Sequence, residues 1–280
     1  MMTRRLIYFP MLINEIKRHF GSISRTELKQ RDSLGLNVES STSTLFSESS
    51  ASFHSTNNSK SSQQNISTEQ NWWFTCKFNE KDCLIPLHLP IGLIFDLLMN
   101  SGTISLPWKL EFHISYDSPI EQNCISPVLN YSALPEESAL TNFYFSALKE
   151  PDHLRSGSAK NVMNLSRSEQ LQLWESLKSG ECEKFWRINQ KLILISSTKS
   201  VPIKFWIFDG VKFSRYQFPV QELCGTLKQV LLTEFSDLFI EKIKNVCLHG
   251  ISIPLNIKLE ELNYNWNYAD NFINIIIKLG

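Results

Sequence analysis

The sequence predicts an α+β fold in which two mixed strand–helix units flank a helix-rich segment. Runs of alternating or continuous apolar residues, separated by turn residues, fill 72–116 and again 201–280. Between them, over 136–195, apolar residues recur three and four positions apart, which is the spacing of helices that bury one face. The length of 280 residues accommodates one large domain or two to three small ones.

Composition narrows the functional classes. The formal net charge is zero, so bulk electrostatics point neither to nucleic acid nor to an anionic membrane. The six cysteines contain no C-x-x-C pair, which argues against zinc and dithiol redox sites and favours free thiols in a reducing compartment. No run approaches the ~20 apolar residues that a membrane helix needs. We therefore expect no metal, no cofactor and no nucleic-acid partner.

The N-terminal 71 residues combine one predicted helix with one predicted disordered segment. Arg4 and Arg5 precede a short apolar run, as in a signal peptide, but Pro10 and charged residues interrupt it without a cleavage site. Apolar positions at helical spacing instead predict an amphipathic helix over 9–20: Leu12, Ile13, Ile16 and Phe20. Residues 37–71 are rich in Ser, Thr, Asn and Gln, and predict a disordered insertion because they bury too little apolar surface.

Order resumes with a strand, strand, helix, strand sequence over 72–116. "WWFTCKF" and "DCLIPLHLP" are expected strands around the turn "NEKD". "PIGLIFDLLMNSG" begins with proline and ends at Gly102, which is the asymmetry expected of a helix. "LPWKLEFHISY" alternates, with Trp108, Leu110, Phe112 and Ile114 on one face and Lys109, Glu111 and His113 on the other.

The middle of the chain predicts helices after a Pro/Ser-rich linker at 117–135. The first helix carries one apolar stripe: Leu140, Phe143, Tyr144, Ala147 and Leu148. Ser166 and Glu169 form a capping-box pattern ahead of "LQLWESLKSG". "ECEKFWRINQKLILI" follows as a further amphipathic helix, with Phe185, Ile188 and Leu192 on its apolar side and Trp186 beside them.

The last segment predicts a β-grasp, or ubiquitin-like, order of elements. "VPIKFWIF" and "VKFSRYQF" flank "DG", a strong hairpin signal. A helix over "LKQVLLTEFSDLF", two short strands with a turn near Gly250 and a short helix over "KLEELNYNW" follow. The apolar strand "NFINIIIKL" closes the segment and is expected at the centre of its sheet. The helix over 9–20 with 72–116 follows the same order without the opening hairpin.

Several long motifs resemble one family. "HLPIGLIFDLL" and "FWRINQKL", together with "LHGI" and "YADNFINIII", are similar to the autophagy protein 5 family. The resemblance implies an α+β fold with two ubiquitin-like (β-grasp) domains flanking a helix-rich domain. On this reading the first domain covers 1–116 with the insertion 37–71, the linker covers 117–135, the helix-rich domain covers 136–195, and the second ubiquitin-like domain covers 200–280.

The resemblance also implies a function in autophagy without catalytic residues of the chain's own. Members of this family receive autophagy protein 12, whose C-terminal glycine forms an isopeptide bond to one lysine through E1-like and E2-like enzymes. The conjugate binds autophagy protein 16 non-covalently and acts like an E3, promoting autophagy protein 8 lipidation and autophagosome formation. The implied location is cytoplasmic and peripheral at the preautophagosomal structure membrane.

Lys149 in "KEPD" is the acceptor that the resemblance implies. The family's acceptor lysine ends a helix roughly a dozen residues before a segment that resembles "SAKNVMNLS", which makes Lys160 the competing lysine. Pro151 disfavours helical geometry at the preceding residue. We therefore expect the helix to end close to Lys149, with the amine on a mobile stem past Leu148, the last packed residue. Two following acids either orient a basic E2-like surface or are solvated charges: Glu150 and Asp152.

The start of the chain departs from the family pattern. Family members carry an N-terminal helix and two strands before the segment that here occupies 9–20, so the resemblance implies a first domain lacking these elements. A missed first exon or a diverged lineage would account for this. The strand at 107–115 would then expose an open edge. Because the first ubiquitin-like domain contributes to the family's groove for autophagy protein 16, that interaction is affected first.

Three alternatives remain open at this point. The chain could be a purely non-covalent scaffold of the same complex, with Lys149 incidental. It could be a cysteine-dependent enzyme, because Cys247 and His249 alternate on one face, although no third orienting residue is evident. The Trp72–Trp73 pair is either one core and one edge residue or a hot spot for a partner. His88 and His113 lack companions for a metal site.

Overall fold

The computed structural model describes residues 5–12, 71–78, 80–102, 107–115, 137–194, 200–221 and 225–280. The expected linker and nearly all of the expected insertion lie outside these residues, as does the expected helix beyond Leu12; residues 9–12 form a helical turn. Asn71, which we placed at the end of the insertion, instead begins a strand. All that follows concerns the compact unit formed by Met1–Leu12 and Gln70–Gly280.

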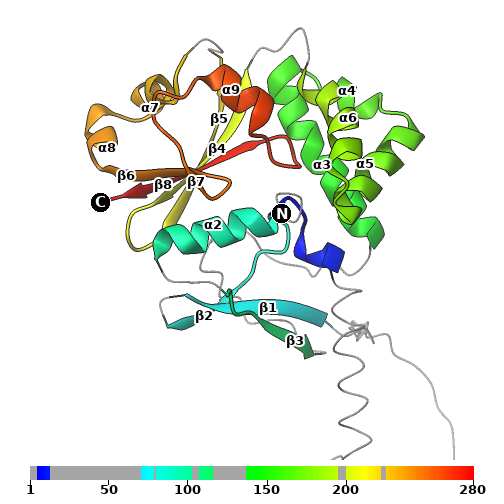
Figure 1. The fold of residues 1–280 in the computed structure, drawn as a ribbon, viewed down its shortest axis with the longest axis horizontal. Helices are drawn as coiled ribbons and strands as arrows, with labels where there is room; N and C mark the ends of the chain where they lie inside the picture. Colours follow the sequence, from blue (N-terminus) through cyan, green and yellow to red (C-terminus); the bar gives the residue numbers. More distant parts are fainter. Residues whose placement is uncertain are drawn as a thin grey trace, which may run out of the picture. The chain divides into compact units, whose positions relative to one another are not determined.

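Among the described residues, the first sheet has three antiparallel strands, in the order β2-β1-β3 (Figure 1). They are β1 (Asn71–Phe78), β2 (Lys81–Leu84) and β3 (Glu111–Ser115). Phe74, Cys76 and Phe78 point to the buried side of β1, whereas Lys77 between them is exposed. Within the described residues β3 pairs with β1 alone, so its other edge meets no described strand.

Helix α2 (Ile91–Ser101) follows the prediction closely. It begins after Pro90 and ends at Gly102, whose φ of 82° places it in the left-handed conformation that favours glycine. Its apolar face is fully buried: Leu93, Ile94, Leu97 and Leu98. Helix α2 packs against strand β8 of the second sheet. On the same helix the buried carboxylate of Asp96 pairs with the guanidinium of Arg5.

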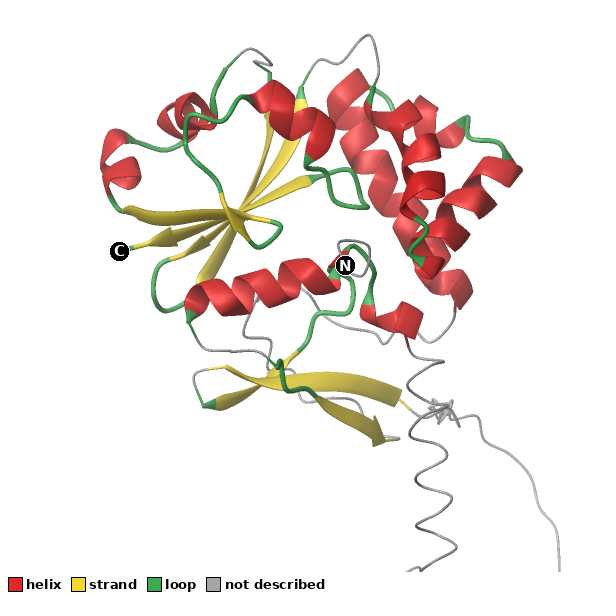
Figure 2. Cartoon of the chain, in the orientation of Figure 1, coloured by secondary structure: helices red, strands yellow, loops and turns green. Residues whose placement is uncertain are grey.

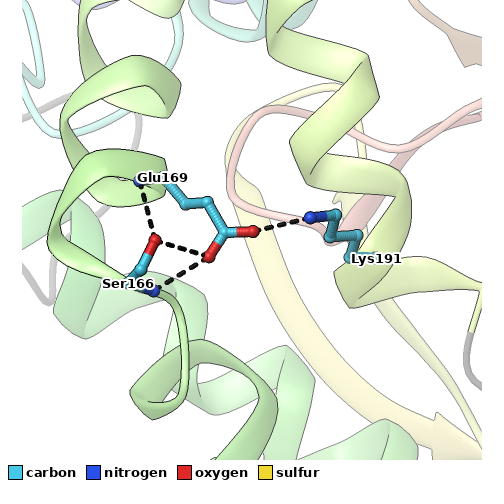
Figure 3. Close-up of polar contacts among 3 residues, drawn as sticks. All are labelled: Ser166, Glu169 and Lys191. Carbon is cyan, nitrogen blue, oxygen red and sulfur yellow. Dashed lines mark hydrogen bonds and ion pairs between the residues drawn. The ribbon is translucent and has the colours of Figure 1, made fainter.

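Four helices form the middle of the chain: α3 (Glu137–Ser156), α4 (Lys160–Met163), α5 (Arg167–Ser179) and α6 (Cys182–Ile193). The predicted capping box is confirmed, since the Glu169 amide donates to Ser166 Oγ at 3.2 Å and the Ser166 amide donates to Glu169 Oε2 at 2.9 Å (Figure 3). Lys191 Nζ lies 2.6 Å from Glu169 Oε1 and joins α6 to the start of α5. Lys191 and Ser166 together lower the pKa of Glu169 to about 2.

The second sheet has five strands in the order β5-β4-β8-β6-β7. They are β4 (Val201–Phe208), β5 (Phe213–Val220), β6 (Ile243–Leu248), β7 (Ile251–Ser252) and β8 (Ile273–Leu279). The hairpin predicted at "DG" joins β4 to β5, and β8 runs parallel to β4 between β4 and β6. The closing strand is therefore central, as its apolar sequence predicts.

In the described part of this unit the helices are short: α7 (Leu227–Glu234), α8 (Asp237–Glu241) and α9 (Leu259–Asn265) (Figure 2). The prediction of one helix over 227–239 is wrong. Phe235 leaves helical geometry with φ −119° and ψ −126°, and its ring packs against Phe205 and Phe218 of the sheet. Ser236 then caps a new helix by accepting from the Phe239 amide at 3.3 Å. The packing of Phe235 on the sheet therefore ends the helix, although the apolar residues continue at helical spacing beyond it.

Candidate functional site

Lys149 lies on the exposed face of helix α3. The opposite face is buried at Leu140, Tyr144 and Leu148, as the predicted stripe requires. Residues that follow one another at spacings of three and four along the helix form an exposed row with Lys149: Asn142, Ser146 and His153. The amine is therefore accessible along one helix face rather than at a chain end.

Lys149 does not stand at the end of its helix, and the expectation that the helix ends there is wrong. Helix α3 continues through Pro151 to Ser156. Proline has no N–H, so the usual helical bond to the carbonyl of Ala147 cannot form. Buried tertiary contacts hold the following turn in place, because Pro151 and Asp152 are both buried. Leu148 is consequently not the last packed residue of the helix.

Asp152 is a buried anchor and not a solvated charge. Its side chain accepts from the Val162 amide at 3.0 Å and from Asn161 Nδ2 at 2.7 Å, which fastens α3 to α4. With 2% of its surface exposed, it is not available to orient a partner. Glu150 is exposed, and it accepts from Gln217 Nε2 of β5 at 2.7 Å. Of the two acids, only Glu150 can meet a partner.

A buried arginine fastens the end of α3 to the second sheet unit. Arg155 is fully buried and donates to Asn263 Oδ1, to Asn267 Oδ1 at 2.6 Å and to the carbonyl of Asn271 at 2.9 Å. Asn189 of α6 joins the same cluster by donating to Asn271 Oδ1 at 2.8 Å. Burial lowers the pKa of Arg155 to about 10, opposed by the nearby charge of Asp152.

A second bond supports the same attachment further along α3. The hydroxyl of Tyr144 donates to the carbonyl of Ala269 at 3.0 Å. The sequence analysis did not identify this polar cluster. The asparagine-rich stretch "NYNWNYADN" beside the apolar closing strand was the available signal. Its partner, an arginine on a distant helix, could not be read from local spacing.

Lys160, the competing lysine, begins the four-residue helix α4 and is also exposed. Exposure alone therefore does not separate the two amines. The two lysines differ in the helix that carries them. Lys149 lies inside a 20-residue helix whose opposite face is bonded to other elements, whereas Lys160 begins a four-residue helix.

Cys247 and His249 lie in environments that oppose cysteine catalysis. Burial raises the pKa of the Cys247 thiol to about 11, whereas a nucleophilic cysteine needs a lowered pKa. Burial lowers the pKa of His249 to about 4, and its ring stacks on Tyr268 and lies 3.1 Å from the carbonyl of Trp266. The imidazole is thus oriented by core groups and stays neutral.

The two histidines considered as metal ligands, His113 and His88, also have structural roles. The ring of His113 stacks on Trp73 and its Nε2 lies 2.8 Å from Thr75 Oγ1. Burial lowers the pKa of His88 to about 4. In the part of the chain that the structure describes, no three His, Cys, Asp or Glu side chains gather as metal ligands would. Searching the same residues for a long apolar helix that could cross a membrane finds none.

Comparisons with known proteins agree on one family. Three family models match this chain: "Autophagy protein ATG5, UblA domain" over residues 43–114, "alpha-helical bundle region" over 137–195 and "UblB domain" over 200–277. Autophagy protein 5 of Aspergillus oryzae is 25% identical over 248 residues, covering 70% of this chain and 74% of that protein.

A second relative and a solved structure belong to the same family. The autophagy protein 5 of Pichia angusta is 26% identical over 231 residues, covering 76% of each chain. The crystal structure of Kluyveromyces marxianus Atg5 aligns with a TM-score of 0.59 at 23% identity, covering 75% of this chain and 73% of that one. At that identity the structural match supports the fold alone, and it agrees with two ubiquitin-like domains flanking a helical bundle region.

Proposed function

The chain belongs to the autophagy protein 5 family, and on this premise we propose that it is the substrate of a ubiquitin-like conjugation reaction. In the proposal, Lys149 forms an isopeptide bond with the C-terminal glycine of autophagy protein 12. The conjugate binds autophagy protein 16 non-covalently, attaches peripherally to the preautophagosomal structure membrane and acts like an E3 for autophagy protein 8 lipidation.

The observation that carries the proposal is the setting of Lys149. Its helix is immobilised on the opposite face by Tyr144 and Arg155, whose bonds reach the second ubiquitin-like domain. Asp152, three residues on, ties the same helix to α4. The Lys149 amine therefore projects from a fixed backbone into solvent, which is the access and position that an acceptor must supply.

Isopeptide formation requires only an accessible, positioned lysine from this chain. A neutral amine attacks the carbonyl carbon of a thioester on the E2-like enzyme; the N–C bond forms, the C–S bond breaks and the thiolate leaves. Most free lysine amines are protonated near pH 7, so a proton must be lost first. We assign that deprotonation to the docked E2-like enzyme, which makes this chain a substrate and scaffold without catalytic residues.

The decisive substitution is Lys149→Arg, with Lys160→Arg as its matched control. Arginine keeps the positive charge and the helical position but cannot form the isopeptide. In a reaction with purified autophagy protein 12 and its E1-like and E2-like enzymes, Lys149→Arg should abolish the higher-mass band on a denaturing gel. Lys160→Arg should leave the band at the wild-type rate.

Two results would contradict this assignment. A band that persists in Lys149→Arg and disappears in Lys160→Arg would move the acceptor to α4. If wild type forms no band but co-elutes with autophagy protein 12 on size exclusion, the chain is a non-covalent scaffold. Circular dichroism of each variant should match wild type, which separates lost chemistry from lost folding.

A further inference from the structure

A shallow groove runs between strand β5 and helix α7 in the second ubiquitin-like domain. It has a volume of about 340 Å³ and is lined by Val220, Gly225, Val230, Thr233, Glu234 and Leu259 among others. Its apolar floor is made by Val220, Val230 and Leu259, which are buried beneath it. A volume of this size accommodates a few side chains of a partner.

Strand β5 forms one wall of this groove and is also an edge of its sheet. Among the described residues it pairs with β4 alone, so one side of its backbone faces no other described strand. An edge strand presents a row of N–H and C=O groups that can bond an added strand. Pro219 cannot donate, so the outward amides that are available lie before it.

Half-exposed aromatic rings extend the apolar surface along the same face of β5. Because strand residues two apart share a face, Tyr216 and Phe218 lie on the side of Val220. Tyr216 is 43% exposed, and its ring meets that of Phe235 edge-on, with 5.5 Å between the ring centroids. The ring of Phe235 stacks on Phe239 of α8 at 4.5 Å. Apolar surface thus continues from the groove toward α8.

The end of the groove at Glu234 carries negative charge. Glu234 is exposed and lines it, and no Lys or Arg is among its described lining residues. Glu234 also ends α7, whose last turn carries no basic residue, so the negative end of the helix dipole adds to its charge. Asp237 of α8 is a further exposed acid that follows. This end of the groove favours a cation.

We propose that this groove binds an extended peptide segment of a partner protein, with alternating aliphatic residues and a flanking Lys or Arg. The segment adds to the edge of β5 as a strand, so main-chain bonds supply affinity. Its alternate side chains lie over Tyr216 and Phe218 and enter the groove at Val220. Its basic flank lies against Glu234. Gln217, on the other face of β5, bonds Glu150 of α3, so the site adjoins that helix, but the proposal does not require conjugation at Lys149.

The test uses the full chain and three fluorescent nine-residue peptides with the same Val/Ile core. One has lysine flanks, one has glutamate flanks, and one has lysine flanks with a central proline. Fluorescence anisotropy should show binding of the lysine-flanked peptide only. The glutamate-flanked and proline-interrupted peptides should bind at least ten-fold more weakly, because the first repels Glu234 and the second cannot form the ladder.

Two charge reversals then locate the site. Glu234→Lys should weaken binding of the lysine-flanked peptide at least five-fold, whereas Glu241→Lys, the same change on α8 outside the groove, should change it less than two-fold. Amide hydrogen exchange should slow within 214–218 on binding. Equal weakening by both variants, equal binding of the proline peptide, or slowed exchange elsewhere would overturn the proposal, as would no binding of any peptide. Lys149→Arg should bind like wild type.

Discussion

Asp152 illustrates at the scale of one residue how position in the chain can mislead. In "KEPD" it follows a lysine, a glutamate and a proline, a composition typical of an exposed helix end. In the structure its carboxylate is 2% exposed and bonds the start of α4. Glu150, two residues earlier, stays at the surface. Adjacent acids therefore differ in role because one faces α4 and the other faces solvent and β5.

Asp152→Ala should lower the free energy of unfolding by about 2–3 kcal/mol, because the Val162 amide and the Asn161 side chain lose their acceptor in a buried site. Urea unfolding followed by circular dichroism measures the change. Glu150→Ala, the matched loss of an exposed carboxylate, should stay within about 0.5 kcal/mol. Equal effects of the two substitutions would mean that the bonds of Asp152 add no stability.

Two histidines make stability depend on pH: His249, which is buried, and His88, which is half-buried. Burial lowers the folded-state pKa of His88 and of His249 to about 4, while an unfolded histidine titrates near 6.5. Between these values the unfolded chain binds more protons, so stability is present above about pH 6.5 and is lost as pH falls toward about 4. Each histidine contributes on the order of 3 kcal/mol across that interval.

The urea midpoint should therefore fall steadily from pH 7 to pH 5. His249→Asn should reduce that slope, because asparagine does not titrate there and tolerates the φ of 52° found at this position. A midpoint that stays constant from pH 7 to pH 5 in wild type would show that both histidines titrate normally in the folded state.

At the scale of elements, helix ends that carry a capping side chain or a glycine form where the sequence predicts them, whereas a proline or continuous apolar spacing does not by itself decide where a helix ends. The capping box of α5 and the glycine end of α2 form as the sequence predicts. Helix α3 instead continues past a proline, and the single helix predicted over 227–239 divides at Phe235. In both exceptions, contacts with other elements outweigh a local preference.

Ser166→Ala should destabilise the protein by about 1 kcal/mol, because the Glu169 amide loses its capping acceptor. Ser168→Ala removes the same hydroxyl from an exposed position two residues later, in the first turn of the same helix, and should be neutral or slightly stabilising. Thermal unfolding by calorimetry compares the two variants. If both variants shift the unfolding midpoint equally, the capping hydrogen bond of Ser166 adds no stability.

At the scale of the whole molecule, the helical region and the second ubiquitin-like domain share a buried polar interface. Arg155, Tyr144 and Asn189 reach it from α3 and α6, and their partners lie between Asn263 and Asn271. Because these groups are buried, each depends on the other side for its hydrogen bonds. The two regions should therefore unfold together.

Arg155→Ala should cost about 3 kcal/mol or more, because it leaves buried acceptors without donors. It should also separate the urea transitions seen by tryptophan fluorescence and by far-UV circular dichroism. Arg187→Ala, the loss of an exposed arginine from α6, is the matched control and should leave one coincident transition. Coincident, unshifted transitions in Arg155→Ala would show that the interface does not couple the two regions.

The sequence by itself determined the order of elements, the β-grasp pattern of the second sheet, the central closing strand, the capped start of α5 and the glycine end of α2. These follow from local properties: apolar periodicity, turn residues and capping side chains act within a few positions. It also singled out Lys149 through resemblance to a family, and the acceptor role remains a proposal.

Only the tertiary structure decided how Lys149 is presented. It placed the lysine within a continuous helix, buried Asp152 three residues further on and brought Arg155 to asparagines more than 100 positions away. It also opened the groove beside β5. Such features depend on which surfaces meet after folding, and a proline or an acid that favours a helix end locally is overruled when buried contacts stabilise the alternative by more.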